Sequence, residues 1–234
     1  MEWYNRTEHL LGSSAIEILK KSSVAICGLG GVGSYVTEAL CRVGIGKFYL
    51  IDNDIYDKTN LNRQLHATTD TIGMTKVQVV KERILKINPG AIVETYEIFL
   101  NKDNIPVVFE QIINQGLDFI VDAIDNITAK VELAIFAEDQ QLKIISSMGT
   151  ANKLDPTKFK IADIYETGVC PLAKVMRKLL KEKAVKHLMV VYSIELPIKS
   201  EKLGSVSYVP STAGLYISYH VTSELLKNIY KKGE

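Results

Sequence analysis

Val24-Ala-Ile-Cys-Gly-Leu-Gly-Gly-Val-Gly-Ser34 is the stretch that decides the fold of this chain. Its first four residues form an apolar run that predicts a buried strand, and apolar residues after the stretch recur at helical spacing. Between them stand the glycines of a G-x-G-x-x-G pattern, Gly28, Gly30 and Gly33. Missing side chains let backbone N–H groups approach a phosphate, and the helix N-terminus adds partial positive charge. This order favours a nucleotide-binding turn over a plain tight turn, without distinguishing a dinucleotide from ATP.

The composition is that of an ordinary globular protein. The 234 residues are enough for one large domain with a sizeable core. The formal net charge of +1 excludes a general attraction to nucleic acid or membrane, so any such attraction must be local. No apolar run is long enough to span a bilayer, and we therefore expect no membrane partner.

The three cysteines, Cys27, Cys41 and Cys170, do not form a disulfide framework. Because the chain has no C-x-x-C pair, a four-cysteine zinc site is excluded. This cysteine usage fits a reducing compartment, and we expect a cytoplasmic protein.

Strand and helix patterns alternate through the first half of the chain. Further strands are predicted at 48–51, 92–98, 118–122 and 143–147, and helices at 14–20, 76–87, 105–113 and 128–138. This alternation predicts an α/β fold with a parallel sheet. After Met148-Gly149 the pattern changes: strands are expected at 158–164 and 188–193, and helices at 171–183 and 212–231.

Polar residues follow the second predicted strand. Asp52 ends that strand, where an acidic residue usually binds ribose hydroxyls, although a plain turn residue is the alternative. The irregular loop after it carries Asn60, Arg63 and Gln64. Lys76 opens the next helix, where a cation is poorly placed against the helix dipole unless an anion binds there. A solvated lysine explains that position equally well.

A second group of carboxylates ends the fourth predicted strand, in Asp122-Ala-Ile-Asp125-Asn126. Residues at the carboxyl end of a parallel strand face the ligand crevice. Asp125 can therefore hold magnesium there, or it can cap the following helix, and the pattern does not choose between the two.

Taken together, these residues fit a nucleoside triphosphate better than a nicotinamide cofactor. A hydride-transfer enzyme has no evident use for Arg63, Gln64 and Lys76, whereas cations neutralise phosphates and a carboxylate holds Mg²⁺. Such a site suits carboxylate activation, in which a carboxylate attacks the α-phosphorus and pyrophosphate leaves.

The first 150 residues resemble the adenylating domain shared by ThiF, MoeB and the ubiquitin-activating enzymes. The matching motifs are Gly28-Leu-Gly-Gly-Val-Gly33, Asp52-x-Asp54, Asn60-Leu-Asn-Arg-Gln64, Gly73-x-x-Lys76 and Asp122-Ala-Ile-Asp125-Asn126. The resemblance implies a Rossmann-like ThiF-type domain, mainly parallel, extended by antiparallel strands in the C-terminal half. It also implies one domain over residues 1–234, with a nucleotide-binding core at 1–150 and a substrate-facing extension at 151–234.

The same resemblance assigns the site residues. It implies ATP and Mg²⁺ as ligands, with Arg63 and Lys76 on the phosphates and Asp125 on the metal as the catalytic residues. The ATP-binding residues that it implies are Gly28, Gly30, Gly31, Gly33, Asp52, Asp54, Asn60, Arg63, Gln64 and Lys76. It further implies a homodimer in which Arg6, a solvated surface charge on composition alone, reaches the neighbouring subunit's ATP.

The second half resembles the tRNA threonylcarbamoyladenosine dehydratases, a branch of that superfamily. The matching stretches are 145–156, 162–164, 171–177 and 191–193. This resemblance implies ATP-driven cyclisation of N6-threonylcarbamoyladenosine in tRNA through adenylation of its side-chain carboxylate. It also admits a sulfur-relay protein as a partner.

A local basic region lies in this half. Between Lys153 and Lys186 there are nine basic and four acidic side chains, a net charge of +5 on a nearly neutral chain. Such a run of basic residues is more often a solvated helix face, and the more specific interpretation is a surface that contacts RNA. With the resemblance, we expect Lys174, Arg177 and Lys178 to contact tRNA.

Two alternative functions stay open. One is an adenylating activator of a ubiquitin-like or sulfur-carrier protein, against which the missing paired C-x-x-C motifs argue. The other is a nucleotide-sensing module without enzymatic activity. Cys170 stands where some of the dehydratases have an acidic residue, and we expect it to have a helix-cap or structural role.

Overall fold

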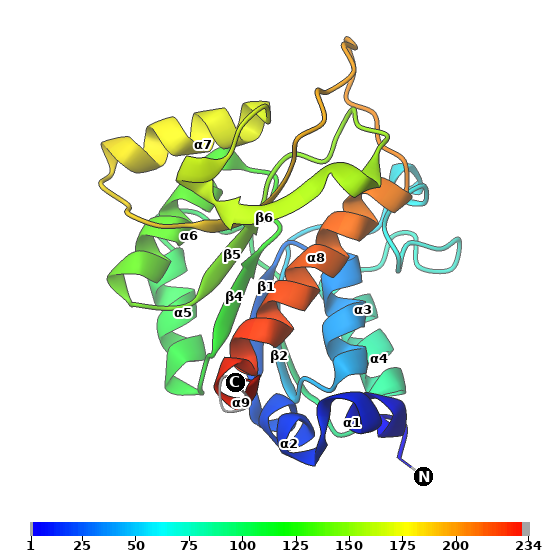
Figure 1. Cartoon of the computed structure of the whole chain (residues 1–234). Coiled ribbons are helices and arrows are strands. Elements are labelled where there is room, and N and C mark those ends of the chain that lie inside the picture. The colour runs from blue at the N-terminus through cyan, green and yellow to red at the C-terminus, as the bar shows by residue number, and fades with distance from the viewer. Residues whose placement is uncertain (1, 231–234) are drawn as a thin grey trace.

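A seven-stranded sheet between two layers of helices forms the centre of the computed structural model, which describes residues 2–230 (Figure 1). The strand order is β3-β2-β1-β4-β5-β7-β6. The strands are β1 (Ser23–Cys27), β2 (Lys47–Ile51), β3 (Ile92–Tyr96), β4 (Phe119–Asp122), β5 (Ile144–Ser147), β6 (Phe159–Asp163) and β7 (Met189–Ser193).

The central strands are buried along their whole length. Every residue of β1 and β4 is buried, because helices cover both faces of the sheet. β1 pairs in parallel with both β2 and β4. The order therefore reverses between β1 and β4, and a ligand crevice is expected at the carboxyl ends of those two strands.

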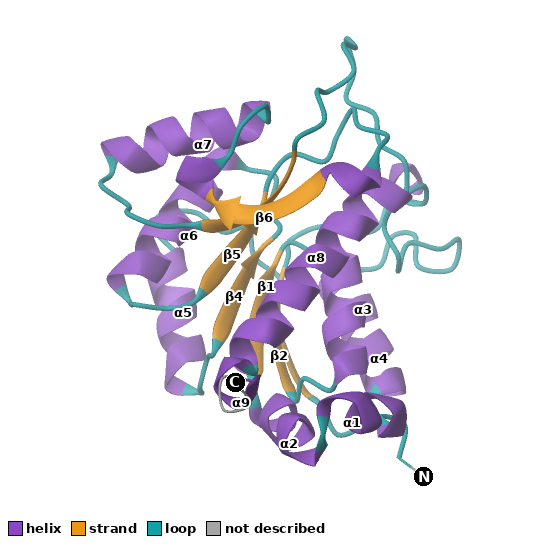
Figure 2. Ribbon diagram, in the orientation of Figure 1, coloured by secondary structure: helices purple, strands orange, loops and turns teal. Residues whose placement is uncertain are grey.

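Helices from both halves of the chain cover the sheet (Figure 2). One face carries α3 (Gly33–Val43), α4 (Lys76–Ile87) and α8 (Tyr208–Leu225). The other carries α5 (Ile105–Asn114), α6 (Ile127–Asp139) and α7 (Pro171–Glu182). The remaining helices of residues 2–230 are α1 (Asn5–Leu11), α2 (Ser13–Lys21), α9 (Lys227–Tyr230) and three short 3₁₀ turns. The largest apolar cluster joins Val36 and Leu40 of α3 to Ala213 and Ile217 of α8, so the two halves share one core.

The predicted fold class is confirmed, with one refinement in the C-terminal half. Of the strands that the structure describes, β6 alone runs antiparallel, at the edge of the sheet beside β7. β7 pairs in parallel with β5, because α7 returns the chain across the sheet before β7 begins. The extension therefore adds one parallel and one antiparallel strand.

The end of the chain also differs from its sequence pattern. α8 begins at Tyr208, four residues before the predicted start at Thr212. Pro210 is tolerated because the first-turn N–H groups of a helix have no partner within the helix. α8 ends at Leu225, α9 follows, and the predicted helix end at Lys231 lies outside the described residues.

Within residues 2–230, no helix combines the length and apolarity that crossing a membrane requires. The three cysteines are free thiols and all are buried.

Candidate active site

The glycine turn between β1 and α3 is packed too tightly for any side chain at two of its positions. Gly28 has a φ of +88°, and a Cβ there would lie 2.7 Å from the Ala123 carbonyl oxygen. A Cβ at Gly33 would lie 1.8 Å from the Gly28 carbonyl oxygen. The turn is therefore held against the loop that follows β4, at the point where the strand order reverses.

Asp52 is tied to this turn at the end of β2. One carboxylate oxygen accepts a 2.6 Å hydrogen bond from the Leu29 N–H, and the other accepts one of 2.8 Å from the Asp54 N–H. Burial raises the pKa of Asp52, a shift that the nearby Lys76 ammonium opposes. Asp52 therefore fixes the glycine turn relative to the loop after β2, whatever else it binds.

Lys76 lies at the first residue of α4, as predicted, but it is not solvated. The residue is only 5% exposed, and its Nζ lies 2.8 Å from an Asp54 carboxylate oxygen and 4.0 Å from one of Asp52. The solvated-lysine alternative is therefore wrong. The Asp54 carboxylate supplies the negative charge that compensates both the Lys76 ammonium and the positive end of the helix dipole. A phosphate can join this carboxylate or displace it.

The loop after β2 folds around a short 3₁₀ turn at Lys58–Asn60. Asp57 and Asn60 cap this turn reciprocally through side-chain hydrogen bonds. The Arg63 guanidinium donates a 2.8 Å hydrogen bond to the Thr59 carbonyl, which holds it over the loop. Gln64 is buried, and its Oε1 has no partner among the described residues. A buried acceptor without a partner is best explained by a ligand or water that donates to it.

Asp125 does not cap α6. Asn126 is the N-cap residue, and its side-chain oxygen accepts a 3.0 Å hydrogen bond from the Ala129 N–H. Asp125 is exposed, and no hydrogen bond or ion pair engages its side chain within residues 2–230. The capping alternative is therefore wrong, and the carboxylate is available to a ligand.

A buried ion pair, missed by sequence reasoning, supports the loop that carries Asp125. Lys130 Nζ lies 2.9 Å from an Asp122 carboxylate oxygen, and both side chains are fully buried. The same ammonium donates to the Ile124 carbonyl at 3.1 Å, and the Ser146 hydroxyl donates to Asp122 at 2.6 Å. The one signal in the sequence was a lysine within an apolar helical run. This network anchors residues 122–124 to the sheet and so determines where Asp125 lies.

These elements surround one cavity of about 1470 Å³ at the carboxyl ends of the strands. One side is formed by the glycine turn and the loop after β2, and the other by residues 147–153, 170–172, 197–200 and 203–205. The predicted site residues that line it are Gly28, Gly30, Gly31, Asp52, Asp54, Asn60, Arg63, Gln64, Lys76 and Asp125. Gly33 is buried beneath the turn. Sequence reasoning missed the apolar wall of Ile98, Leu100 and Ile124, because nothing in their pattern distinguishes it from core.

Cys170 precedes α7 at the N-cap position, but its side chain makes no capping hydrogen bond. It is 1% exposed and packs in the apolar cluster beneath α6 and α7, and the residue is also part of the cavity lining. Its predicted cap role is therefore wrong and its predicted structural role fits.

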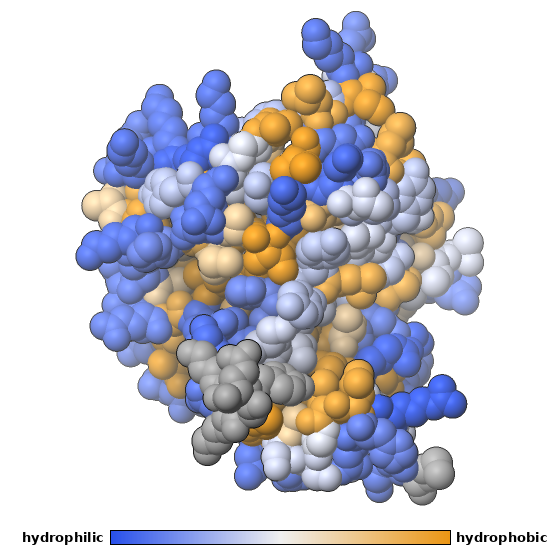
Figure 3. Space-filling model, viewed as in Figure 1, coloured by the Kyte–Doolittle hydropathy of each residue, from blue (hydrophilic) through white to orange (hydrophobic). Residues whose placement is uncertain are grey.

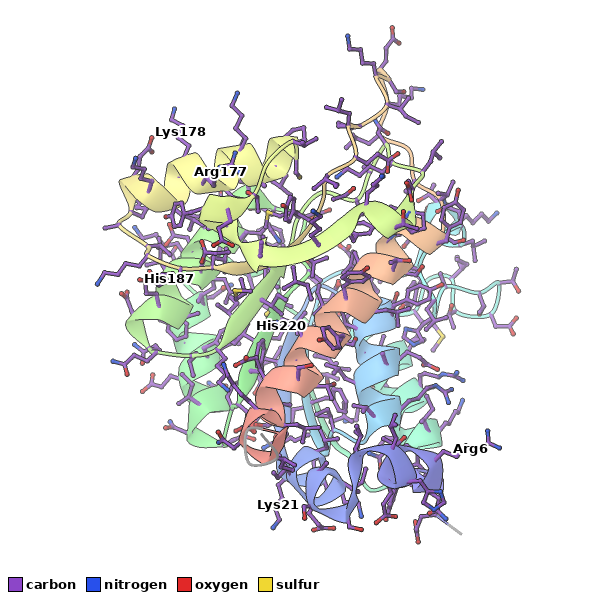
Figure 4. The ribbon with its side chains drawn as sticks, viewed as in Figure 1. Arg6, Lys21, Arg177, Lys178, His187 and His220 are labelled. Carbon is purple, nitrogen blue, oxygen red and sulfur yellow. The ribbon has the colours of Figure 1, made fainter. Side chains whose placement is uncertain are left out.

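The other predicted residues lie away from this cavity. Arg6 is on α1, at the opposite end of the sheet, where it lines a smaller hollow with Leu10 and Tyr219 (Figure 4). Lys174 and Lys178 are exposed on α7, a surface that is hydrophilic in Figure 3. Arg177 is half-buried, and its guanidinium donates to the Thr167 carbonyl at 2.9 Å and to the Thr167 hydroxyl.

Comparison with known proteins decides the family. The sequence profile of the ThiF family matches residues 4–231. The chain belongs to the ThiF family. The relationship suggested by the glycine, Asp52 and Lys76 motifs is thus confirmed over nearly the whole chain.

This ThiF-family protein is similar to proteins named tRNA threonylcarbamoyladenosine dehydratase. The one from Bacillus subtilis is 42% identical over 246 aligned positions, which cover 97% of this chain and 95% of the relative. The one from Escherichia coli is 32% identical, over 90% of this chain and 80% of the relative.

Solved structures agree with this similarity. The E. coli dehydratase TcdA has been solved with ATP and with AMP. Each of the two has a TM-score of 0.90 and 30% sequence identity to this ThiF-family protein, covering 97% of this chain and 95% of the other. E. coli MccB, at 20% identity and a TM-score of 0.68, shares the fold.

Proposed function

We propose that this chain is an ATP-dependent tRNA threonylcarbamoyladenosine dehydratase. The observation that carries the proposal is that its 42% identity to the B. subtilis dehydratase spans both sides of the cleft. The nucleotide side alone would fit any ThiF-family adenylating enzyme. The second half supplies the opposite wall, where an acceptor must lie.

The cavity suits ATP in its shape and chemistry. Asp52 and Asn60 would face the ribose, and the apolar wall of Ile98, Leu100 and Ile124 would take the flat base. The unpartnered Gln64 oxygen supports a ligand at the glycine turn, because it needs a donor. Arg63 and Lys76 would contact the phosphates, where Lys76 would exchange part of its pairing with Asp54.

Asp125 would hold Mg²⁺, because one carboxylate together with phosphate oxygens is a common magnesium site. When bound, the metal neutralises charge on the phosphates. Within residues 2–230 no cluster of three acidic, histidine or cysteine side chains forms a preassembled metal cage. We therefore assign the metal to the complex with ATP, in which phosphate oxygens add to its ligands.

The chemistry needs no protein nucleophile. The threonyl carboxylate attacks the α-phosphorus of ATP, a P–O bond forms, and pyrophosphate leaves. An N–H or O–H group of the same side chain then attacks the activated carbonyl carbon, AMP leaves with the bonding electron pair, the attacking atom gives its proton to solvent, and the ring closes. The nucleoside loses the elements of water, which are taken up as ATP becomes AMP and pyrophosphate. Arg63 and Lys76 would stabilise the developing charge, and the cleft would hold the reacting atoms together.

A homodimer is part of the proposal. Arg6 is remote from the cavity of its own chain, so it can serve an ATP site only in a neighbouring subunit. Beside Arg6, Leu10 is 83% exposed and Tyr219 is 69% exposed, which supports an apolar contact at this end of the molecule. A sulfur-relay partner rests on the resemblance alone.

The reaction is tested by mass spectrometry of nucleosides from tRNA that carries N6-threonylcarbamoyladenosine, after incubation with this protein, Mg²⁺ and ATP. We expect the nucleoside to lose the mass of one water only when ATP is present. The work-up must avoid hydrolysis, because the cyclic product reopens. If the nucleoside is unchanged while ATP still binds, the proposal is wrong. Pyrophosphate exchange that depends on a carrier protein would then support the activator alternative.

The tRNA surface gives a separate prediction. The double variant Lys174→Glu/Lys178→Glu should weaken tRNA binding about tenfold or more and reduce the salt dependence of binding, with ATP affinity unchanged. Arg177 is left intact, because its bonds to Thr167 make it part of the fold. Filter binding over a salt series measures the effect.

The matched control is Lys21→Glu/Lys86→Glu, which reverses the charge of two exposed lysines at the far end of the molecule (Figure 4 labels Lys21). It changes the net charge equally. Equal loss of tRNA affinity in both double variants would mean that binding follows net charge, and that α7 is not the tRNA surface.

A further inference from the structure

Lys153 is a buried cation on the wall of the cleft that the mechanism above does not use. It lies in the loop between β5 and β6, is 3% exposed, and lines the same cavity as the glycine turn and Asp125. Its Nζ donates a 2.7 Å hydrogen bond to the Gly149 carbonyl. The other two N–H donors of the ammonium have no partner within residues 2–230.

Among residues 2–230, no carboxylate lies within ion-pairing distance of the Lys153 Nζ, so no ion pair neutralises its charge there. Burial lowers the pKa of Lys153, against the weaker opposing influence of the Cys170 thiol and the Glu195 carboxylate. Glu195 is already engaged, because it accepts hydrogen bonds from the Leu154 and Asp155 N–H groups. A buried charge without a partner is costly, so a built-in site of this kind suits an anion that arrives with a ligand.

The loop around Lys153 is held rigidly. Asn152 has a φ of +57° and forms two backbone hydrogen bonds with the segment at 195–205. Its N–H donates to the Gly204 carbonyl at 2.8 Å, and its carbonyl accepts from the Ile198 N–H at 2.7 Å. Its side-chain oxygen accepts a third, from the Gly204 N–H, at 2.6 Å. With the hydrogen bond from the Leu154 N–H to Glu195, the residues on both sides of Lys153 are tied to the neighbouring segment without a ligand, which lowers the entropic cost of using its charge.

The sheet order determines which ligand group Lys153 can meet. The nucleotide residues follow β1 and β2, Asp125 follows β4, and the loop of Lys153 follows β5. Because β5 lies beyond β4 in the sheet, the loop of Lys153 is on the far side of Asp125 from the residues assigned to the nucleotide, which is where the acceptor would lie.

We propose that Lys153 binds the carboxylate that this enzyme activates, and so determines specificity for an acidic acceptor. The inference rests on the proposed function. A charge-assisted hydrogen bond from the ammonium would hold the threonyl carboxylate beside the α-phosphorus. After adenylation the same donor would remain on the acyl carbonyl oxygen, where negative charge develops during ring closure.

The test compares two ligands and two proteins. The ligands are tRNA carrying N6-threonylcarbamoyladenosine and the same tRNA with the threonyl carboxyl converted to its methyl ester. The proteins are wild type and Lys153→Met, which keeps an unbranched side chain, one atom shorter, and removes its charge. Binding is measured without ATP, and the KM and kcat of the acid substrate are measured with ATP.

In wild type we expect the ester to bind about tenfold to a hundredfold more weakly than the acid. In Lys153→Met the two ligands should bind equally, and the KM for the acid should rise by a similar factor while ATP affinity is unchanged. Lys86→Met, on the exposed end of α4, controls for the loss of one positive charge and should retain the wild-type difference.

Two outcomes overturn the inference. If Lys153→Met still discriminates acid from ester as wild type does, Lys153 does not contact the carboxylate. If discrimination persists while the melting temperature and ATP affinity fall, the lysine only ties the loop to Gly149. Wild-type protein that binds modified tRNA but never dehydrates it contradicts the proposed function instead, so the two failures are distinguishable.

Discussion

An Asp125→Asn enzyme is expected to form the acyl adenylate about 100- to 1000-fold more slowly than wild type, with no loss of stability. The asparagine keeps the shape of the side chain and removes the charge that would hold Mg²⁺. Stability should be unaffected, because Asp125 is exposed and the neighbouring Asn126 provides the helix cap. The measurement is tRNA-dependent exchange of pyrophosphate into ATP over a series of Mg²⁺ concentrations.

Asp139→Asn is the matched control, since Asp139 is an exposed aspartate at the other end of the same helix. It should leave the exchange rate within experimental error of wild type. If Asp125→Asn exchanges pyrophosphate at the wild-type rate, the metal assignment is wrong. If its rate recovers fully at high Mg²⁺, Asp125 binds the metal without contributing to the chemical step.

The second large effect concerns stability. Lys130→Met should lower the free energy of unfolding by about 3–5 kcal/mol, because it leaves the fully buried Asp122 carboxylate without its counter-charge. The Ser146 hydroxyl and the Ile124 N–H would remain as donors to Asp122, but neither neutralises it. Urea unfolding followed by circular dichroism measures the loss.

A double variant separates lost charge pairing from lost packing. Lys130→Met/Asp122→Asn should recover part of the stability, because the buried carboxylate is then gone. Lys86→Met, on the surface, should stay within about 0.5 kcal/mol of wild type. A loss under about 1 kcal/mol for Lys130→Met would contradict the inference that this ion pair supports the Asp125 loop.

Several features could be predicted from local sequence. The glycine turn, the strand before it and the helix after it were all found, because steric exclusion at Gly28 and Gly33 leaves a recognisable pattern. Residues spread from Gly28 to Asp125 could be assigned to one site, since parallel strands bring their carboxyl ends to one edge of the sheet. The alignment with the B. subtilis dehydratase extends over nearly the whole chain.

Other features were decided by contacts between distant residues. The sequence pattern allowed Asp125 either to bind magnesium or to cap the next helix. Asn126 caps that helix in the structure, which excludes the capping role for Asp125. The sequence pattern allowed Lys76 to be either solvated or bound to an anion. Its ion pair with Asp54, across the loop after β2, excludes the solvated alternative. The direction of β7 depended on where α7 returned the chain to the sheet.

The sequence by itself determined the nucleotide turn, the alternation of strands and helices, and the residue types at the strand ends, because these depend on neighbours within a few positions. Only the tertiary structure decided the burial of Lys130 against Asp122 and of Lys153 on the wall of the cleft. A lysine has the same local pattern whether its ammonium meets water or a carboxylate. Which one it meets depends on how the helices and loops pack over the sheet, and that packing involves residues far apart in the chain.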